Sequence, residues 1–453
     1  MTHQVAIIGA GPSGCALACF LQQRGIDCLV FDDDKKPSLL VGESLVPAAM
    51  PLIKRLGIET EIASYSAVKR GAALRHAEIG TRTDFSFRRF KKQVPDYAYN
   101  IPRPQFDRSL ISRAKQLGVT FINHKASVEQ CSELDKELQL SDQSLVAAGL
   151  TRATQPQLLI DATGRSRLFS RILNIDATRG PRNDVAHFAH FTSNKSDSRL
   201  PGQVVISVLK CGWSWQIPLS ENMTSVGVVM NSEAAKSYGT TSEQRLLRAI
   251  KHNPELRKMG YQRQSGVKTY SNYQLISQQA HGKGWALVGD ALGFVDPMLS
   301  PGVFMALESA DLLDKKLTSK NGKLNTKPES LDEYYQEILH WHDSWSSLID
   351  YFYDGRLLAL SERRPEIDPN KKLSVTKFID GLVGSVLARL ISGVGTRSKT
   401  NHKILSVLTK LITYNSNNSD EFAIQSTPPH VSEIENLDKI TEISNYQTQE
   451  AAR

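Results

Sequence analysis

The chain has 453 residues, a formal net charge of +8 and a hydrophobic fraction of 40%, so it can bury a large core and form two or three domains. No apolar run approaches the ~20 residues that a membrane-spanning helix needs, and the N-terminus enters a predicted strand too early for a signal peptide. We therefore expect a cytoplasmic protein. No C-x-x-C pair occurs, which predicts core cysteines of a reducing compartment, without a metal site or disulfides, at Cys15, Cys19, Cys28, Cys131 and Cys211.

The first 32 residues predict a strand, a glycine turn, a helix and a second strand. The apolar run Val5–Ile8 leads directly into a G-x-G-x-x-G motif at residues 9–14. Apolar residues then recur at helical spacing until Gly25, and a second apolar run, Cys28–Phe31, ends in Asp32.

Each part of this unit has a physical role in binding a dinucleotide. Gly9, Gly11 and Gly14 let the backbone turn tightly and approach a pyrophosphate, and the helix offers its first N–H groups, including that of Ser13. Asp32 can accept hydrogen bonds from a ribose. The motif predicts a dinucleotide site and does not by itself distinguish FAD from NAD.

The segment Gly212–Pro218 reads G-W-S-W-Q-I-P and predicts a strand that ends at its proline. Side chains on a strand alternate between faces, so Trp213 and Trp215 share one face with Ile217. By itself, such a strand is typical of a half-buried sheet with large core residues.

Further downstream, two apolar runs each lead into a glycine turn. Leu158–Ile160 precedes Asp161-Ala162-Thr163-Gly164-Arg165, and Trp285–Val288 precedes Gly289-Asp290-Ala291. Two shorter elements are Gly42-Glu43-Ser44 and an R-x-x-F-D pattern that begins at Arg103.

These elements, in this order from residue 5 to about residue 315, resemble the single-chain flavin-dependent halogenases, which belong to the FAD-dependent monooxygenase superfamily. The tryptophan strand matches their W-x-W-x-I-P signature. The resemblance implies an α/β protein with the fold of p-hydroxybenzoate hydroxylase. That fold has a Rossmann-like FAD-binding domain, an inserted antiparallel β-sheet substrate domain and, here, a C-terminal helical region.

The resemblance also implies FAD as the cofactor, with Asp290 on its ribityl chain. The implied FAD-binding residues are Gly9, Gly11, Ser13, Gly14, Asp32, Glu43, Arg103, Gly164, Gly289, Asp290, Pro297 and Gly302. In the family, reduced flavin and oxygen form a C4a-hydroperoxide, which lasts only in a dry pocket. Trp213 and Trp215 would line the substrate cavity and keep the substrate away from the flavin.

In halogenases a halide attacks this peroxide, and the resulting hypohalous acid reaches a lysine beside the substrate. The residue that matches the family's K-x-G element is Lys69, which we expect to have a lowered pKa through burial. The alternative is a solvated lysine among neighbouring basic residues. A second implied catalytic residue is Ser300, in a loop where Leu299 replaces the glutamate of tryptophan halogenases and Pro301 stiffens the turn that neighbours the halide site.

We expect four parts along the chain. Residues 204–208 are predicted to pair with the tryptophan strand, and helices are predicted over residues 303–317 and 331–361, the second with core aromatic residues. The predicted parts are a discontinuous FAD-binding domain (1–75, 100–180 and 280–320), a substrate-side sheet domain (76–99 and 181–279), a C-terminal helical region (321–414) and a disordered tail (415–453).

The positive charge is concentrated in residues 369–414, where eight basic residues stand against Asp380. The apolar residues of this segment repeat at helical spacing, which is typical of an amphipathic helix packed on the body of the protein. Two other interpretations are a docking surface for an acidic protein partner and contact with a membrane surface. Nucleic acid is not expected as a partner, because no recognition module accompanies the charge.

Two reactions fit the motifs. The first is halogenation of an electron-rich aromatic ring, with the substrate free, carrier-bound or protein-borne and reduced flavin supplied by a separate flavin reductase. The second is hydroxylation of an aromatic ring by a flavin monooxygenase, with a tryptophan of another protein as one substrate, as in quinone cofactor maturation of an amine oxidase.

Overall fold

The computed structural model describes residues 3–35, 37–76, 80–90, 95–132, 136–193, 195–209, 211–271, 274–362, 389, 391–393 and 423–424. The chain divides into two compact units, each assembled from separate stretches. The first unit contains residues 1–65, 101–180 and 273–347, and the second contains residues 66–100, 181–272 and 348–453.

The centre of the first unit is a six-stranded, mostly parallel sheet. Its strand β1 (Val5–Ile8) lies between β2 (Cys28–Asp32) and β10 (Leu158–Asp161), parallel to both. All four residues of β1 are buried, as expected for a parallel strand covered on both faces. The sheet order is β19 (His281–Gly282), β20 (Trp285–Leu287), β10, β1, β2 and β7 (Thr120–Asn123), and only β19 is antiparallel to its neighbour.

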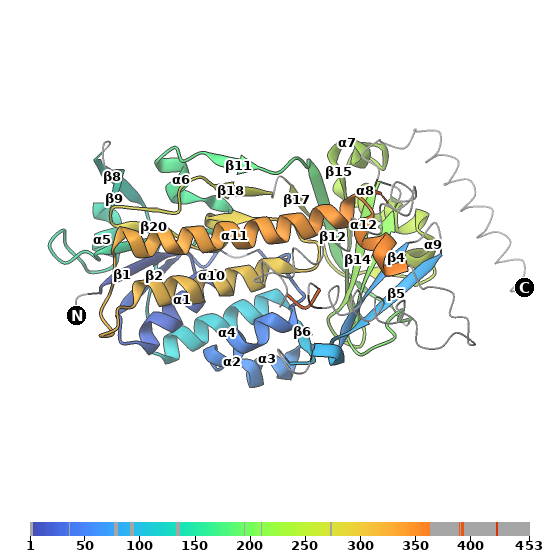
Figure 1. The fold of residues 1–453 in the computed structure, drawn as a ribbon, viewed down its shortest axis with the longest axis horizontal. Helices are drawn as coiled ribbons and strands as arrows, with labels where there is room; N and C mark the ends of the chain where they lie inside the picture. The colour runs from blue at the N-terminus through green and yellow to red at the C-terminus, as the bar shows by residue number, and fades with distance from the viewer. Residues whose placement is uncertain are drawn as a thin grey trace, which may run out of the picture. The chain divides into compact units, whose positions relative to one another are not determined.

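Helices pack against this sheet and against one another. Helix α1 (Pro12–Gln23) contacts both α10 (Pro301–Leu317) and α4 (Arg103–Gln116), and the three helices lie side by side in Figure 1. The other helices of this unit are α2 (Met50–Leu56), α3 (Glu59–Tyr65), α5 (Asp142–Ala147), α6 (Leu168–Ile172) and most of α11 (Pro328–Tyr353). Two small sheets complete it, β8 (Val128–Ser132) with β9 (Glu137–Leu140), and β11 (Ala177–Arg179) with β18 (Leu275–Ser277) and β21 (Gly293–Phe294).

The second unit is built on an eight-stranded sheet. The tryptophan strand is β14 (Gly212–Pro218), which pairs antiparallel with β13 (Val204–Leu209) and β15 (Met223–Asn231), so the predicted partner strand is confirmed. The other strands are β16 (Gln262–Arg263), β12 (Asp184–Thr192), β17 (Lys268–Ser271), β4 (Gly71–His76) and β5 (Thr81–Ser86), and a separate pair is formed by β3 (Ala67–Lys69) and β6 (Ala98–Asn100).

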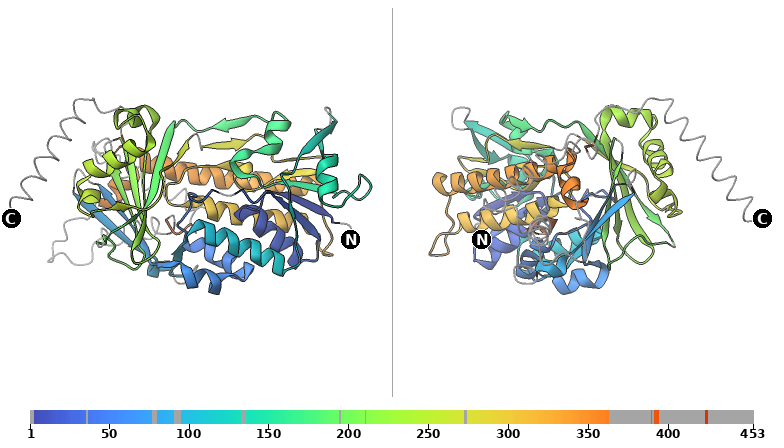
Figure 2. Two further views of the ribbon diagram at one scale, coloured as in Figure 1. Left: turned by 180° about the vertical axis from the view of Figure 1, so that it is seen from behind. Right: turned by 45° about the vertical axis from the view of Figure 1, so that its right-hand side comes forward.

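Three helices cover one face of this sheet (Figure 2), namely α7 (Ser232–Ser237), α8 (Ser242–His252) and α9 (Pro254–Arg257). Helix α8 begins with a capping box, in which the Thr241 side chain accepts from the backbone N–H of Gln244 and the Gln244 side chain accepts in return. Apolar residues of α7 and α8 pack on Val226 and Val228 of β15, so this face has its own hydrophobic core.

The structure corrects several expectations. Cys131 is exposed, so it is not the core cysteine that we expected. The helix predicted over residues 331–361 is two helices, α11 and α12 (Arg356–Glu362), because Gly355 has a left-handed φ of 80° that ends the first helix. Residues 66–75, which we assigned to the FAD-binding domain, belong to the second unit, because β4 pairs with β13 of the large sheet.

Most of the basic segment at residues 369–414, and almost all of the tail at 415–453, lie outside the described residues. The interpretations of those segments therefore remain predictions. Among the described helices, none has the length and apolar character needed to cross a membrane.

Candidate functional site

The glycine turn after β1 is packed tightly against the turn after β10. A side chain at Gly9 would place its Cβ 2.5 Å from the carbonyl oxygen of Ala162, and Gly9 itself has a φ of 108°. A Cβ at Gly14 would lie 2.0 Å from the carbonyl oxygen of Gly9. These two positions require glycine, and they bring the G-x-G-x-x-G motif into contact with the segment that begins at Asp161.

Gly11 differs from its neighbours, because a Cβ added there would meet no atom within 4 Å. Gly11 is also the N-cap of α1, and it provides no side-chain hydrogen bond to the first N–H groups of that helix. A helix N-terminus with open space in front of it is suited to a phosphate group. The residues present therefore fit the pyrophosphate of a dinucleotide.

The third glycine motif meets the first one. A Cβ at Gly289, which has a φ of 63°, would lie 2.5 Å from the Oγ of Ser13. The short helical turns Gly164–Ser166 and Gly289–Ala291 also contact each other. The structure thus joins three motifs that are more than 100 residues apart in the sequence.

Asp290 lies beside this junction with a perturbed carboxyl group. Burial raises the pKa of Asp290 to about 6, and the positive charges of Arg103 and Arg165 act in the opposite direction. The two guanidiniums contribute an attractive field at this carboxylate. Arg103 is thus electrostatically coupled to the G-D-A motif, and its expected approach to the flavin stays a prediction.

Arg103 is buried and is not a surface charge. It forms an ion pair with Asp107 one helical turn later, with 3.1 Å between Nε and Oδ1, and it donates from Nη1 to the carbonyl oxygen of Val41. A Cβ at Gly42 would lie 2.8 Å from Nη1 of Arg103. Glu43 is 2% exposed, and its carbonyl oxygen accepts from the N–H of Ile101. The R-x-x-F-D and G-E-S elements therefore form one packed cluster.

The loop before α10 has an unusual backbone. Leu299 and Ser300 both have positive φ values, 63° and 60°, which cost a non-glycine residue roughly 1 kcal/mol or more each. The N–H of Ser300 donates to the carbonyl oxygen of Pro297, and Ser300 is the N-cap of α10 without a side-chain capping bond. A Cβ at Gly302 would lie 2.9 Å from the Phe294 ring. This loop holds Pro297, Ser300 and Gly302 in a constrained turn.

In the second unit, Lys69 is buried rather than solvated. It is 3% exposed at the end of β3, and its Nζ lies 5.6 Å from the centre of the Phe87 ring. Burial lowers the pKa of Lys69 from 10.5 to about 7, so a large fraction of the amine is neutral near pH 7. The neutral amine has a lone pair that can act as a nucleophile or accept a hydrogen bond.

Asn100 connects the strand of Lys69 to the tryptophan strand, and no motif in the sequence indicated this role. β3 pairs with β6, and the Nδ2 of Asn100 on β6 donates to the carbonyl oxygens of Gly202 and Pro218, at 2.8 and 2.9 Å. A Cβ at Gly202 would lie 2.2 Å from the carbonyl oxygen of Val68. One buried amide therefore ties the last residue of the W-x-W-x-I-P signature to the backbone around Lys69.

The two signature tryptophans are nearly fully buried and lie against each other, with 5.7 Å between ring centres. Trp215 donates from Nε1 to the Oγ of Ser225. Its ring fits because Gly227 has no Cβ, which would lie 2.2 Å from the ring. Trp213 donates from Nε1 to the Oη of Tyr353. The opposite face of the strand is also buried, so β14 is not half-buried as the sequence alone indicated.

Comparison with known proteins assigns the chain to a family. A family model described as tryptophan halogenase matches residues 87–356, which is more than half of the chain, and a model of an NAD(P)-binding Rossmann-like domain matches residues 7–44. The chain belongs to the tryptophan halogenase family. Members of this family are flavin-dependent oxidoreductases with FAD as cofactor, so the predicted enzyme class and cofactor are confirmed.

Individual relatives of this tryptophan halogenase family member are distant in sequence. It is 28% identical over 413 residues to a 1H-pyrrole-2-carbonyl-[peptidyl-carrier protein] chlorinase of Pseudomonas fluorescens, covering 84% of this chain and 90% of the relative. It is 26% identical over 361 residues to a tryptophan 2-halogenase of Chondromyces crocatus, covering 78% of this chain and 68% of that relative.

Among solved structures, the flavin-dependent brominase Bmp2 matches with a TM-score of 0.73 and 19% identity, over 91% of this chain and 98% of that one. At this identity the similarity supports the fold alone. The expected α/β class with a Rossmann-like domain is confirmed.

Proposed function

We propose that this protein halogenates an electron-rich aromatic ring and that Lys69 delivers the halogen. The observation that carries the proposal is the burial of Lys69 together with its lowered pKa, because an exposed ammonium would have no lone pair available near pH 7. The same unit carries the tryptophan signature, tied through Asn100 to the backbone beside Lys69.

The residues proposed to hold FAD are those of the packed motifs in the first unit. Gly9, Gly11, Ser13 and Gly14 would receive the pyrophosphate and Asp32 the ribose, while Asp290 would bind the ribityl chain. Glu43, Arg103, Gly164, Gly289, Pro297 and Gly302 would shape the rest of the site. When bound and reduced, FAD would supply two electrons to oxygen and so provide the oxidant.

The overall reaction balances as follows. Reduced FAD, oxygen, a halide ion, a proton and an aromatic C–H give oxidised FAD, an aryl halide and two water molecules. Within it, the halide loses two electrons and becomes hypohalous acid. Nζ of neutral Lys69 either hydrogen-bonds this acid or forms an N–halogen bond with loss of water, and the aromatic carbon then takes the halogen while its proton leaves.

For the substrate, we propose an aromatic ring that is free or tethered to a carrier protein. The chlorinase that matches over most of both chains is named for a pyrrole carried on a peptidyl-carrier protein. Leu299 stands where tryptophan halogenases have a glutamate, which favours a substrate other than free tryptophan.

The test supplies the FAD-loaded enzyme with chemically reduced FAD, oxygen, chloride or bromide, and a panel of phenols, indoles and pyrroles. Each ring is offered free and, where it bears a carboxyl group, as a carrier-protein thioester. Product mass is the readout. We expect a mass gain of one halogen that depends on halide and disappears in Lys69→Met. Lys236→Met, which removes an exposed lysine of the same unit, is the matched control.

A gain of one oxygen without halide dependence would contradict halogenation and would support direct hydroxylation, the second reaction that the motifs allow. Halogenation that survives Lys69→Met would keep the reaction class but remove Lys69 from it. The two parts of the proposal therefore fail separately.

A further inference from the structure

A cavity lies in the second unit, on the face of the large sheet opposite the tryptophans. It measures about 320 Å³, within the range of small-molecule sites. Its floor includes Val205 and Gln216, and its walls include the loop at residues 195–202 together with Met259 and Tyr261. Gln216 alternates with Trp215 along β14, so the two side chains point to opposite faces. Neither Lys69 nor a signature tryptophan lines this cavity.

The amide of Gln216 has a donor without a partner. Gln216 is 4% exposed, and its Oε1 accepts a hydrogen bond of 2.6 Å from the hydroxyl of Tyr261. Burial and the nearby Asp197 carboxylate raise the pKa of Tyr261, so this hydroxyl keeps its proton and fixes the orientation of the amide. Nε2 then finds no hydrogen-bond partner among the described residues. An unpaired buried donor is destabilising, and an acceptor atom of a ligand would relieve that cost.

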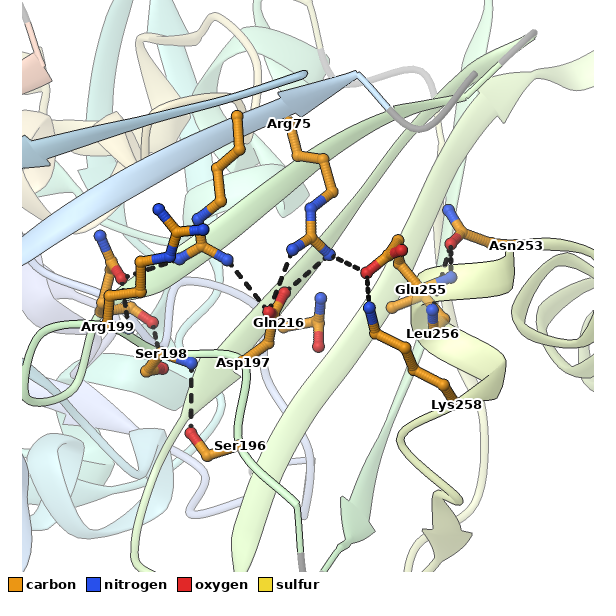
Figure 3. A network of polar contacts seen from close by, with 12 residues as sticks. Arg75, Ser196, Asp197, Ser198, Arg199, Gln216, Asn253, Glu255, Leu256 and Lys258 are labelled. Atoms are coloured by element: carbon orange, nitrogen blue, oxygen red, sulfur yellow. Dashed lines mark hydrogen bonds and ion pairs between the residues drawn. The ribbon is translucent and has the colours of Figure 1, made fainter. Parts of the chain in front are cut away.

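Two carboxylates line the cavity, of which Glu221 is exposed to solvent and Asp197 is already neutralised. Arg75 contacts both oxygens of Asp197, at 2.8 and 3.0 Å, and Arg82 donates to Oδ1 at 3.0 Å. Figure 3 shows Arg75 extending from Asp197 to Glu255, which also pairs with Lys258. Because two guanidiniums pair with it, Asp197 does not repel an anion as a lone carboxylate would.

The remaining polar groups of the wall are mainly donors. Lys195 uses one N–H for the carbonyl oxygen of Lys258, at 2.9 Å, and an ammonium has two more. The hydroxyls of Ser196 and Ser220 accept from backbone N–H groups and keep their own protons to donate. Apolar surface comes from Met259, Val205 and the Tyr261 ring. Apart from the exposed carboxylate of Glu221, the cavity thus offers mainly donors and one apolar side.

We propose that this cavity binds a small organic acid, whose carboxylate accepts from Gln216 Nε2 and Lys195 Nζ while its apolar body packs on Met259 and Tyr261. This site is separate from the proposed halogenation site and does not depend on that function.

The test measures benzoate binding to the FAD-loaded enzyme by isothermal titration calorimetry, with benzyl alcohol as the uncharged probe of similar size. We expect the wild type to bind benzoate saturably and to bind benzyl alcohol at least about tenfold more weakly. We also expect Gln216→Leu and Lys195→Met to bind benzoate at least about tenfold more weakly than the wild type, since one charge-assisted hydrogen bond is worth that factor or more. Lys236→Met removes an equal charge outside the cavity and is expected to bind benzoate like the wild type.

Equal affinity in the wild type, Gln216→Leu and Lys195→Met would overturn the proposal, as would a lack of saturable binding at millimolar benzoate. Should Gln216→Leu fail to fold, Lys195→Met decides the matter, because Lys195 is exposed and its replacement leaves the buried network intact. Loss of halogenation in the Lys69 test has no bearing on this outcome.

Discussion

The Nε1 of Trp213 donates a hydrogen bond of 2.9 Å to the Oη of Tyr353, 140 residues further along the chain. Phe352 meets the same indole edge-on, with 6.2 Å between ring centres. Tyr353 is itself held, because the Arg182 guanidinium lies over its ring and its carbonyl oxygen accepts from the N–H of Ile424. The end of α11 therefore fixes the orientation of the first signature tryptophan.

Replacing Tyr353 with phenylalanine should leave the indole N–H of Trp213 buried without an acceptor. We expect a loss of about 1–3 kcal/mol in the free energy of unfolding, measured by urea denaturation, and a changed near-ultraviolet dichroism of the tryptophans. Tyr351→Phe is the control, since Tyr351 lies on the same helix and packs under Arg356 instead. Equal stability of the two variants would show that this hydrogen bond contributes nothing.

Short-range signals predicted the nucleotide-binding part of the fold correctly. An apolar run, a glycine turn, helical spacing and Gly25 are neighbours in the sequence, so the ends of β1, α1 and β2 follow from local rules. Gly355 is a local signal for the break between α11 and α12 in the same way. The prediction missed this break because the apolar residues keep helical spacing across residues 331–361.

Long-range packing could not be predicted. The burial of Lys69 was expected from the family resemblance alone, because its place beside Arg70 in a basic stretch is typical of a solvated strand. In the structure β3 pairs with β6, and the loop at Gly202 approaches the backbone of Val68. Asn100 and Tyr353 belong to no motif, and they act through contacts more than 100 residues away. The motifs therefore identified the cofactor chemistry but missed the residues that hold the tryptophan strand.

Gly227 provides the space for the ring of Trp215. An alanine there would place Cβ 2.2 Å from the indole, so Gly227→Ala should lower the free energy of unfolding by about 3 kcal/mol and weaken the bond from Trp215 to Ser225. Gly266→Ala, where an added Cβ meets no atom within 4 Å, should change it by less than about 0.5 kcal/mol. Urea denaturation of both variants checks the contrast, and similar losses would contradict it.

Gly11 and Gly14 should respond differently to alanine. At Gly11 the added Cβ is unobstructed, so the unfolding free energy of the FAD-free protein should fall by at most about 1 kcal/mol. FAD affinity should nevertheless drop at least about tenfold, because the methyl group occupies space proposed for the pyrophosphate. Gly14→Ala should destabilise the FAD-free protein itself, since its Cβ would lie 2.0 Å from a carbonyl oxygen. Flavin fluorescence titration and urea denaturation separate these effects, and normal FAD affinity in Gly11→Ala would remove that residue from the site.

The lowered pKa of Lys69 should appear in the pH dependence of stability. Its pKa is about 7 in the folded protein and 10.5 as the reference value, so between these limits the unfolded chain binds more protons and stability rises with pH. Relative to Lys69→Met, the free energy of unfolding of the wild type should rise by about 1.4 kcal/mol per pH unit in this window. Below pH 7 the buried amine is charged, and the wild type bears the full cost of burying that charge. Urea denaturation at pH values across the window measures the slope, and Lys236→Met serves as the exposed-lysine control. Parallel pH profiles for the wild type and Lys69→Met would mean that Lys69 keeps an ordinary pKa, and the proposed neutral amine would then be untenable.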